Sequence, residues 1–318
     1  MSSSITETEF FDAKSSLTDS LTELFDSDAA EKIGKASSSV IGKVAYDGGF
    51  FKKAGRAALI SGGAIGIAAL AATPPGWVLG AIAGGVFLTY MIAQYVMETK
   101  ADQNRATAIY RCTDPHAKVS FGQMAAFKLS AMQRTMGLRG DNYNEVHRDE
   151  ETRGRILLGH LPNKSIGDLE TLRNKENVTA IVSINEPWER YDFGSSKPVR
   201  PDELKSNNID YLPIQAKDHV RLTTDQLDAA AEFINRKVAA GETVYVHCRA
   251  GVGRSAMGVA AALMNKDTDR EVDSVANQIK SHRTSSTIKK KIEGPGGLRE
   301  YQAVLQERAL KVAGESGQ

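Results

Sequence analysis

The chain has 318 residues, of which 41% are hydrophobic and 25% charged, and its 40 Lys and Arg nearly balance its 39 Asp and Glu. These fractions exclude a wholly disordered chain. The formal net charge of +1 argues against a nucleic-acid-binding protein with a basic surface. Two cysteines, Cys112 and Cys248, are too few for a disulfide framework or a four-thiolate zinc site, which favours a reducing compartment.

Residues 1–54 are predicted to form an acidic tail rich in serine and threonine. The first 50 residues carry nine acidic and four basic side chains. They lack the basic segment and apolar core of a secretory signal, and they are too acidic for a mitochondrial transit peptide. We therefore expect a partly disordered surface tail with one or two short helices.

Residues 55–99 are the most apolar part of the sequence. Stretches 57–72 and 77–97 contain no charged residue, and a Thr-Pro-Pro-Gly breaker separates them. The second stretch meets the length of about 20 residues that a bilayer-spanning helix needs. Basic residues flank both ends, so the pattern predicts a membrane helical hairpin over 57–97 with both ends on the cytoplasmic, reducing face. The alternative is a buried helical pair in a soluble domain.

Two small-residue patterns occur within these apolar stretches. Glycines four residues apart let two helix backbones approach closely. Helix–helix self-association is therefore predicted at Gly62-x-x-x-Gly66 and Gly80-x-x-x-Gly84.

Residues 100–150 are predicted to be a basic, amphipathic lead-in. Segment 115–140 holds four basic residues and no acidic one. It also carries large apolar residues that suit one helix: Phe121, Met124, Phe127, Leu129, Met132 and Met136. Such a helix beside a membrane segment either lies in the lipid headgroup plane or packs its apolar face on the following domain. Both alternatives stay open, and they do not exclude each other.

Residues 151–318 are predicted to form an α/β domain with a central sheet flanked by helices, because strand and helix patterns alternate along them. Strands are expected at 155–159, 178–184, 209–214 and 243–247. Helices are expected at 166–176, 224–240, 255–265, 270–282 and 297–312.

The predicted strand at 243–247 runs directly into a string that carries chemistry: His247-Cys248-Arg249-Ala250-Gly251-Val252-Gly253-Arg254-Ser255. A loop that enters a helix points backbone N–H groups into one concavity, which binds a phosphate dianion. Gly251 and Gly253 are expected to allow a tight, partly left-handed turn. Arg254 offers a fork for two phosphate oxygens. The alternative is a structural turn with a buried cysteine.

Cys248 at the bottom of this cradle is the predicted nucleophile. The potential that binds phosphate also stabilises a thiolate, which lowers a thiol pKa to about 4–6. His247 is expected to brace the loop, and the Ser255 hydroxyl to donate to the departing thiolate. Arg249 adds positive charge at the rim. The six histidines show no metal-ligand spacing, and the chemistry requires neither a metal nor another cofactor.

This string resembles the signature loop of the cysteine-dependent protein tyrosine and dual-specificity phosphatases. The resemblance implies that Cys248 is the nucleophile, Arg254 the phosphate clamp and Ser255 the hydroxyl that assists hydrolysis. Residues 247 and 249–253 are then expected to bind substrate. It also implies a general-acid aspartate on a loop about thirty residues upstream. Asp218 precedes Cys248 by 30 residues in a predicted loop, and Asp225 is the second choice.

Three motifs narrow the resemblance to mitochondrial-type lipid phosphatases that dephosphorylate phosphatidylglycerophosphate: Leu158–Pro162, Ser183–Glu189 and His247–Gly251. The similarity covers about residues 120–312. Two features depart from it. Val252-Gly253 is closer to tyrosine phosphatases, and 281–294 looks like an insertion whose Lys289, Lys290 and Lys291 either contact anionic lipid or are simply solvated.

Three functions are compatible with these features. The first is a membrane-anchored phosphatase of a phospholipid phosphomonoester, either phosphatidylglycerophosphate or a phosphoinositide. The second is a dual-specificity phosphatase of phosphotyrosine, phosphoserine or phosphothreonine in proteins. The third is a membrane scaffold whose phosphatase-like domain only binds phosphate. The resemblance implies a mitochondrial membrane as one location.

Overall fold

The computed structural model describes residues 76–137 and 142–315. The acidic tail and the first apolar stretch, including Gly62 and Gly66, lie outside these residues. The chain divides into two compact units, Met1–Tyr95 and Val96–Gln318. The second unit holds the sheet and the loop 247–255.

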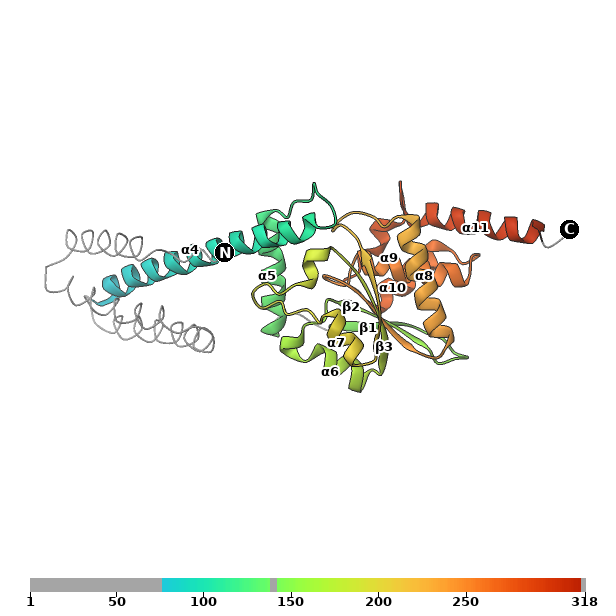
Figure 1. Cartoon of the computed structure of the whole chain (residues 1–318), viewed down its shortest axis with the longest axis horizontal. Helices are drawn as coiled ribbons and strands as arrows, with labels where there is room; N and C mark the ends of the chain where they lie inside the picture. The colour runs from blue at the N-terminus through green and yellow to red at the C-terminus, as the bar shows by residue number, and fades with distance from the viewer. Residues whose placement is uncertain (1–75, 138–141, 316–318) are drawn as a thin grey trace. The chain divides into compact units, whose positions relative to one another are not determined.

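A five-stranded sheet forms the centre of the second unit, with the strand order β1-β2-β5-β3-β4 (Figure 1). The strands are β1 Tyr143–Arg148, β2 Arg155–His160, β3 Val178–Asn185, β4 Asp210–Gln215 and β5 Thr243–Cys248. β1 is antiparallel to β2, and the other neighbours are parallel. The predicted α/β class with a central sheet is therefore confirmed. The sequence does not predict β1, because this polar edge strand buries only Val146 fully.

The central strands contribute side chains to two hydrophobic cores, one on each face of the sheet. Val244 and Val246 of β5 join the larger core, and Tyr245 between them joins the smaller one. This alternation follows from the two-residue period of a strand. Because both faces are covered, β5 is buried along its whole length. Cys248 therefore emerges from a rigid strand in the middle of the sheet.

Helices cover both faces of the sheet (Figure 1). The larger core is closed by α8 Thr224–Ala239, α9 Arg254–Lys266, α10 Val272–His282, α11 Leu298–Glu315 and the 3₁₀ turn Ile288–Lys291. The smaller core is closed by α6 Asp168–Glu170 and α7 Pro201–Ser206. A further 3₁₀ turn, Pro187–Arg190, follows β3.

The single helix predicted over 166–176 is wrong. The segment instead forms a 3₁₀ turn at Lys164–Ile166, then α6, then a π-helical turn at Thr171–Lys175. The cause is Gly167, whose φ of 73° ends the first turn in the left-handed conformation that glycine adopts readily.

α4 is one continuous helix, Gly76–Arg111. It begins at the predicted breaker and extends well past the predicted end of the apolar stretch at residue 97. Among the residues that the structure describes, no helix combines the length and apolar character needed to cross a membrane. The first half of the predicted membrane hairpin lies outside the described residues, so the hairpin and the self-association at Gly80 and Gly84 stay predictions.

α5, Phe121–Thr135, packs on the catalytic domain, as the second alternative for the lead-in predicts. The ring of Phe127 contacts that of Trp188 edge-on, with centroids 5.1 Å apart. Its basic residues do not all face solvent: Lys128 is buried and pairs with Asp102 of α4 at 2.7 Å. Part of the predicted apolar face stays exposed instead, namely Phe121, Leu129, Met132 and Met136.

Candidate active site

Loop 247–255 joins the end of β5 to the start of α9. Donors from outside the loop hold four of its carbonyl groups: the Leu161 N–H binds Arg249, the Arg283 side chain binds Ala250 and Gly251, and Thr287 binds Val252. Across a trans peptide, the following N–H points the opposite way. The loop therefore turns its carbonyls outward and its N–H groups toward the concave side, as an anion cradle at a helix N-terminus requires.

The two glycines of the loop have different roles. Gly251 has a φ of 67°, and a Cβ there would lie 2.3 Å from the carbonyl oxygen of Gly159. Both the conformation and the close approach therefore require glycine. Gly253 has a φ of −122°, and a Cβ there would meet nothing closer than Thr287 Oγ1 at 3.5 Å. The turn is partly left-handed, as predicted, and the left-handed residue is Gly251 and not Gly253.

Replacing Gly251 with alanine is expected to destabilise the protein by about 1–3 kcal/mol or more, because the change adds left-handed strain to a steric overlap. Thermal unfolding monitored by circular dichroism measures this loss. Gly253→Ala is the matched control and should unfold close to the wild-type temperature. Equal unfolding temperatures for the two variants would contradict this account of the loop.

Cys248 is 3% exposed at the end of β5. Its sulfur accepts hydrogen bonds from the Gly251 N–H at 3.2 Å and from the Ser255 hydroxyl at 3.3 Å. Burial by itself raises the pKa of this thiol. The charge of Arg254 and the hydrogen bonds from Ser255 and Gly251 outweigh burial, and they hold the pKa below its ordinary value. The site therefore favours the thiolate, which is the nucleophilic form of cysteine.

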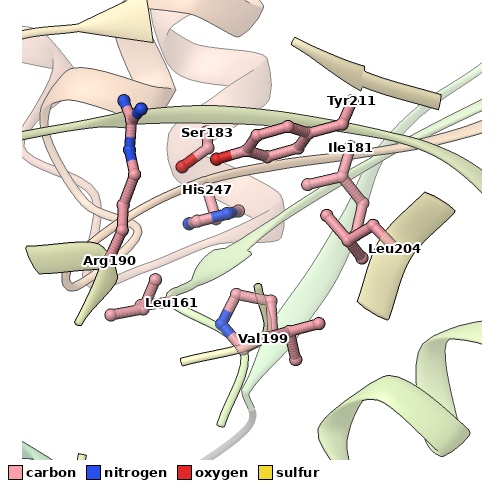
Figure 2. A pocket seen from close by; sticks show the side chains of 9 residues that line it. Leu161, Ile181, Ser183, Arg190, Val199, Leu204, Tyr211 and His247 are labelled. Atoms are coloured by element: carbon pink, nitrogen blue, oxygen red, sulfur yellow. The ribbon is translucent and has the colours of Figure 1, made fainter. Parts of the chain in front are cut away.

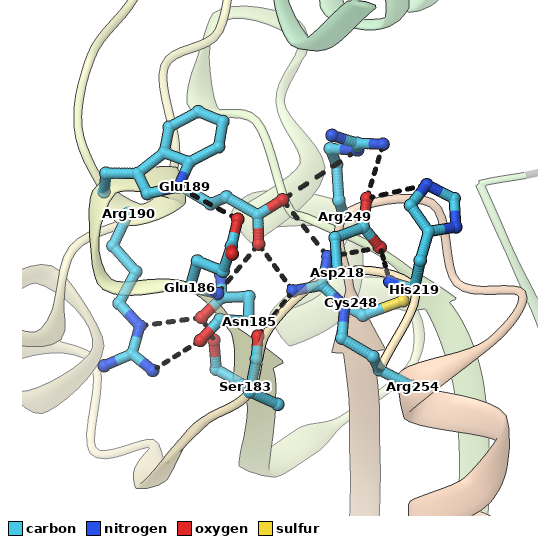
Figure 3. Close-up of polar contacts among 12 residues, drawn as sticks. Ser183, Asn185, Glu186, Glu189, Arg190, Asp218, His219, Cys248, Arg249 and Arg254 are labelled. Atoms are coloured by element: carbon cyan, nitrogen blue, oxygen red, sulfur yellow. Dashed lines mark hydrogen bonds and ion pairs between the residues drawn. The ribbon is translucent and has the colours of Figure 1, made fainter. Parts of the chain in front are cut away.

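Arg254 is the first residue of α9 and is 4% exposed. Its terminal nitrogens donate to the two carboxylate oxygens of Glu189 at 2.8 and 3.1 Å, and this bidentate pair fixes the guanidinium plane. Its Nε is buried and has no hydrogen-bond partner among the described residues. Figure 3 shows Arg254 beside Cys248. A donor held in this way is suited to bind an oxygen of a phosphate on the sulfur.

Asp218 lies in the loop between β4 and α8, and its side chain is 15% exposed. Oδ2 is 2.7 Å from Nη2 of Arg249, and Oδ1 is 3.4 Å from Nη2 of Arg254 (Figure 3). Burial raises the pKa of this carboxyl, but the charges of Arg254 and Arg249 outweigh it and lower the pKa. The structure thus brings Asp218 to the cradle. It leaves Asp225 exposed in the first turn of α8.

Two buried glutamates that received no role from the sequence lie on the other side of Arg254 (Figure 3). Besides pairing with Arg254, Glu189 accepts the Glu186 N–H at 2.8 Å. Glu186 accepts the Trp188 indole N–H at 2.9 Å and the Tyr110 hydroxyl at 3.3 Å. Both glutamates belong to a motif that carried the family resemblance. The sequence did not predict the pairing of Glu189 with Arg254, because the two residues are 65 positions apart in the chain.

Segment 281–294, which the sequence suggested is an insertion, is part of the packed structure. Ile288 and Ile292 are 0% and 5% exposed and belong to the larger core. Arg283 is 5% exposed and donates from Nε to the Gly251 carbonyl at 2.6 Å. Thr287 donates its backbone N–H to the Val252 carbonyl at 2.7 Å. The segment therefore supports the signature loop from behind.

The three consecutive lysines of this segment lie beside the loop. Lys289 and Lys290 are exposed, and Lys291 is half-buried. The Lys291 Cε would be 4.0 Å from a Cβ on Gly253, so its side chain reaches the edge of the cradle. Together with Arg249, these lysines extend the positive charge beyond the phosphate site itself.

His247 lies behind the loop rather than on its substrate side. Its ring packs against the ring of Tyr245, with the two ring planes inclined to each other. Both side chains lie on the face of the sheet opposite to Cys248. Burial lowers the pKa of His247 to about 3. With Ser183 and Arg190, it lines an internal cavity of about 10 Å³ that is large enough for one water (Figure 2). The structure therefore fits a bracing role for His247 and does not bring its ring to the substrate.

A thiolate, an arginine fork and a carboxylate around an anion cradle define a phosphatase site of the cysteine type, and comparisons with known proteins agree. The family "Dual specificity phosphatase, catalytic domain" matches residues 169–303. The mouse protein "Phosphatidylglycerophosphatase and protein-tyrosine phosphatase 1" is 31% identical over 180 residues, which cover 55% of this chain and 85% of that protein.

One further protein and one solved structure are also similar to this chain. The Arabidopsis thaliana protein "Phosphatidylglycerophosphate phosphatase PTPMT1" is 37% identical over 102 residues, 31% of this chain and 27% of that protein. The structure "Crystal Structure of PTPMT1 in complex with PI(5)P" is 27% identical, with a TM-score of 0.43, and the alignment covers 53% of this chain and 99% of that one.

The chain belongs to the dual-specificity phosphatase family, in the group that includes phosphatidylglycerophosphatase and protein-tyrosine phosphatase 1. It is a cysteine-dependent phosphatase.

Proposed function

We propose that this enzyme hydrolyses a phosphomonoester on a glycerophospholipid, either phosphatidylglycerophosphate or a phosphoinositide. The observation that carries the chemistry is the buried Nε of Arg254, a fixed donor without a partner among the described residues and next to the Cys248 thiol, whose pKa is lowered. The names of the mouse and Arabidopsis relatives support the lipid. Lys291 and Arg249, at the edge of the cradle, support a substrate with negative charge beyond the phosphate that reacts.

In the first step, the Cys248 thiolate attacks phosphorus in line with the leaving oxygen. The sulfur–phosphorus bond forms, and the bond to the leaving oxygen breaks. Asp218, in its acid form, gives its proton to that oxygen, so the alcohol departs neutral. Arg254 and the loop N–H groups bind the equatorial oxygens, where charge is spread in the transition state.

In the second step, the phosphocysteine is hydrolysed. The Asp218 carboxylate accepts a proton from water, whose oxygen attacks phosphorus as the sulfur–phosphorus bond breaks. Phosphate departs, and the thiolate of Cys248 is restored. Ser255 donates its hydroxyl hydrogen bond to the sulfur at this point, from its position 3.3 Å away.

Asp218 must carry a proton to act as the acid, although two arginines lower its pKa in the free enzyme. A bound phosphate dianion competes for the same arginine charges and places two negative charges near the carboxyl. Like charge raises the pKa of a carboxyl. Substrate binding is therefore expected to raise the pKa of Asp218 and to load the proton that the first step consumes.

The Asp218→Ala variant is expected to lower kcat/KM for alkyl phosphates by about 10²–10⁴-fold, the usual contribution of a general acid. The loss should be much smaller for p-nitrophenyl phosphate, whose leaving group needs no proton. Steady-state rates on the two substrates measure the difference. The control is Asp225→Ala, which should retain activity on both. A leaving-group-dependent loss in the control instead would move the general acid to Asp225.

The substrate class is tested with the purified full chain in mixed micelles. Phosphate release is measured from phosphatidylglycerophosphate, a series of phosphoinositides, and tyrosine-, serine- and threonine-phosphorylated peptides. We expect the highest kcat/KM for one of the lipids. Preference for the peptides would instead support protein dephosphorylation, the second candidate, which the mouse relative's name also mentions. The phosphate-binding scaffold is set aside because the chain belongs to a family of enzymes.

The location stays a prediction from resemblance. A lipid substrate requires the catalytic unit to work at a membrane surface, and the family resemblance favours a mitochondrial one. Subcellular fractionation of the tagged full chain tests this, since exclusive recovery away from mitochondria would contradict it.

A further inference from the structure

The end of α4 lies against the segment that carries Asp218. We call residues Tyr110–Asp114 the lead-in turn and residues Gln215–His219 the acid loop. Two side-chain contacts join them directly: Gln215 Nε2 donates to Thr113 Oγ1 at 3.3 Å, and Lys217 pairs with Asp114 at 3.2 Å. Thr113 and Gln215 are 102 residues apart, so only the tertiary structure brings these segments together.

A third contact runs through a buried carboxylate. The Tyr110 hydroxyl donates to Glu186 at 3.3 Å, and the backbone N–H of Asp218 is near enough to this carboxylate to help lower its pKa. Tyr110 is 2% exposed, and burial together with Glu186 raises the pKa of its hydroxyl, so this group remains a donor. The Lys217–Asp114 pair is weaker, because its side chains are 58% and 29% exposed and solvent screens them.

The lead-in turn is itself held firmly. The N–H groups of Thr113 and Asp114 both donate to the Tyr110 carbonyl at 3.0 Å. Tyr110 belongs to a buried cluster that includes Phe127 of α5 and Trp188. The acid loop, by contrast, ends in exposed side chains: His219 is 88% and Val220 54% exposed. The lead-in turn is therefore the more rigid of the two segments, and its contacts can hold the acid loop in place.

We propose that the lead-in turn positions the general acid. A general acid works only within hydrogen-bond reach of the leaving oxygen, and a misplacement of about 1 Å can cost about 10²-fold in rate. Tyr110 holds Glu186, whose carboxylate lies near the Asp218 backbone. Thr113 contacts Gln215 at the end of β4, and Asp114 pairs with Lys217, the residue directly before Asp218. None of the three residues of the lead-in turn touches the reacting atoms, so they are positioning residues. The inference rests on the proposed role of Asp218.

The test is a full-length triple variant, Tyr110→Phe, Thr113→Val and Asp114→Asn, with Tyr110→Phe alone as the conservative version. We expect kcat/KM for glycerol 3-phosphate to fall about 10–100-fold in the triple variant, and kcat/KM for p-nitrophenyl phosphate to fall less than about 3-fold. Cys112→Ser, in the same turn with an exposed side chain, is the matched control and should behave as wild type on both substrates.

A second measurement separates positioning from general loss of structure. In an Asp218→Ala background, the triple change should leave kcat/KM for glycerol 3-phosphate within about 2-fold, because the group it positions is already absent. Equal losses on both substrates, or a full further loss in that background, would overturn the proposal. If the activity loss in Asp218→Ala does not depend on the leaving group, then Asp218 is not the general acid, and the positioning role fails with it. The lipid substrate is tested separately, by measuring phosphate release from lipids and peptides.

Discussion

Replacing Cys248 with serine is expected to lower phosphatase activity by at least about 10³-fold while phosphate binding persists. An alcohol at this position lacks the lowered pKa that makes sulfur a nucleophile, so no covalent intermediate forms. The cradle does not depend on the sulfur: its carbonyls are held by Arg283 and Thr287, and Arg254 is held by Glu189. Phosphate release gives the activity, and isothermal titration with vanadate or phosphate gives the binding.

The second cysteine of the chain provides the control for this experiment. Cys112 is exposed at the end of α4, and Cys112→Ser should retain full activity. The two variants differ only in which sulfur is replaced. Substantial turnover by Cys248→Ser would show that the reaction does not pass through a phosphocysteine.

The change Arg254→Lys is expected to lower kcat/KM by about 10²–10³-fold, the usual cost of losing one preorganised donor to a transition state. A lysine keeps the positive charge but has no fork, so it cannot bind both Glu189 oxygens and a phosphate oxygen together. The loss should appear in kcat more than in KM, because the missing donor acts mostly in the transition state.

Stability should also fall in Arg254→Lys, since the Glu189 carboxylate is fully buried and would keep only part of its compensation. Chemical denaturation measures this change. The control is Arg308→Lys, at a half-exposed ion pair with Asp228, where both activity and stability should stay close to wild type. Wild-type kcat/KM in Arg254→Lys would mean that charge alone, and not the fork, binds the phosphate.

Most of the sheet and the core of the signature loop could be predicted from sequence because they depend on local patterns. β2, β3 and β5 read as largely apolar runs, since both faces of the sheet are buried around them. The edge strand β4 is mostly not buried, but it still carries apolar residues. Cys248, Arg254 and Ser255 lie within one strand–loop–helix segment, so their spacing along the chain already brings them together. Asp218, in contrast, was predicted from the family resemblance, which implies an aspartate about thirty residues before the cysteine. β1 was missed because most of its residues, Tyr143–Arg148, are polar.

The features that the sequence left open concern segments whose environment is set by distant parts of the chain. An amphipathic pattern at 115–140 does not reveal which side packs, and α5 turns Lys128 inward because Asp102 of α4 pairs with it. Likewise, the lysine-rich appearance of 281–294 does not reveal that Ile288 and Ile292 belong to the larger core. In both cases a charged stretch is part of the packed structure, which composition cannot show.

The sequence by itself determined the α/β class and placed a cysteine and an arginine in one strand–loop–helix segment typical of a phosphate cradle, because those properties depend on neighbouring residues. The tertiary structure decided which groups make that arginine rigid, support the loop and hold the acid. Glu189 meets Arg254 across 65 residues, Arg283 meets Gly251 across 32, and Tyr110 meets Glu186 across 76. Such pairs form only when separate elements pack together, since the free energy that stabilises each contact comes from burial that no short segment provides.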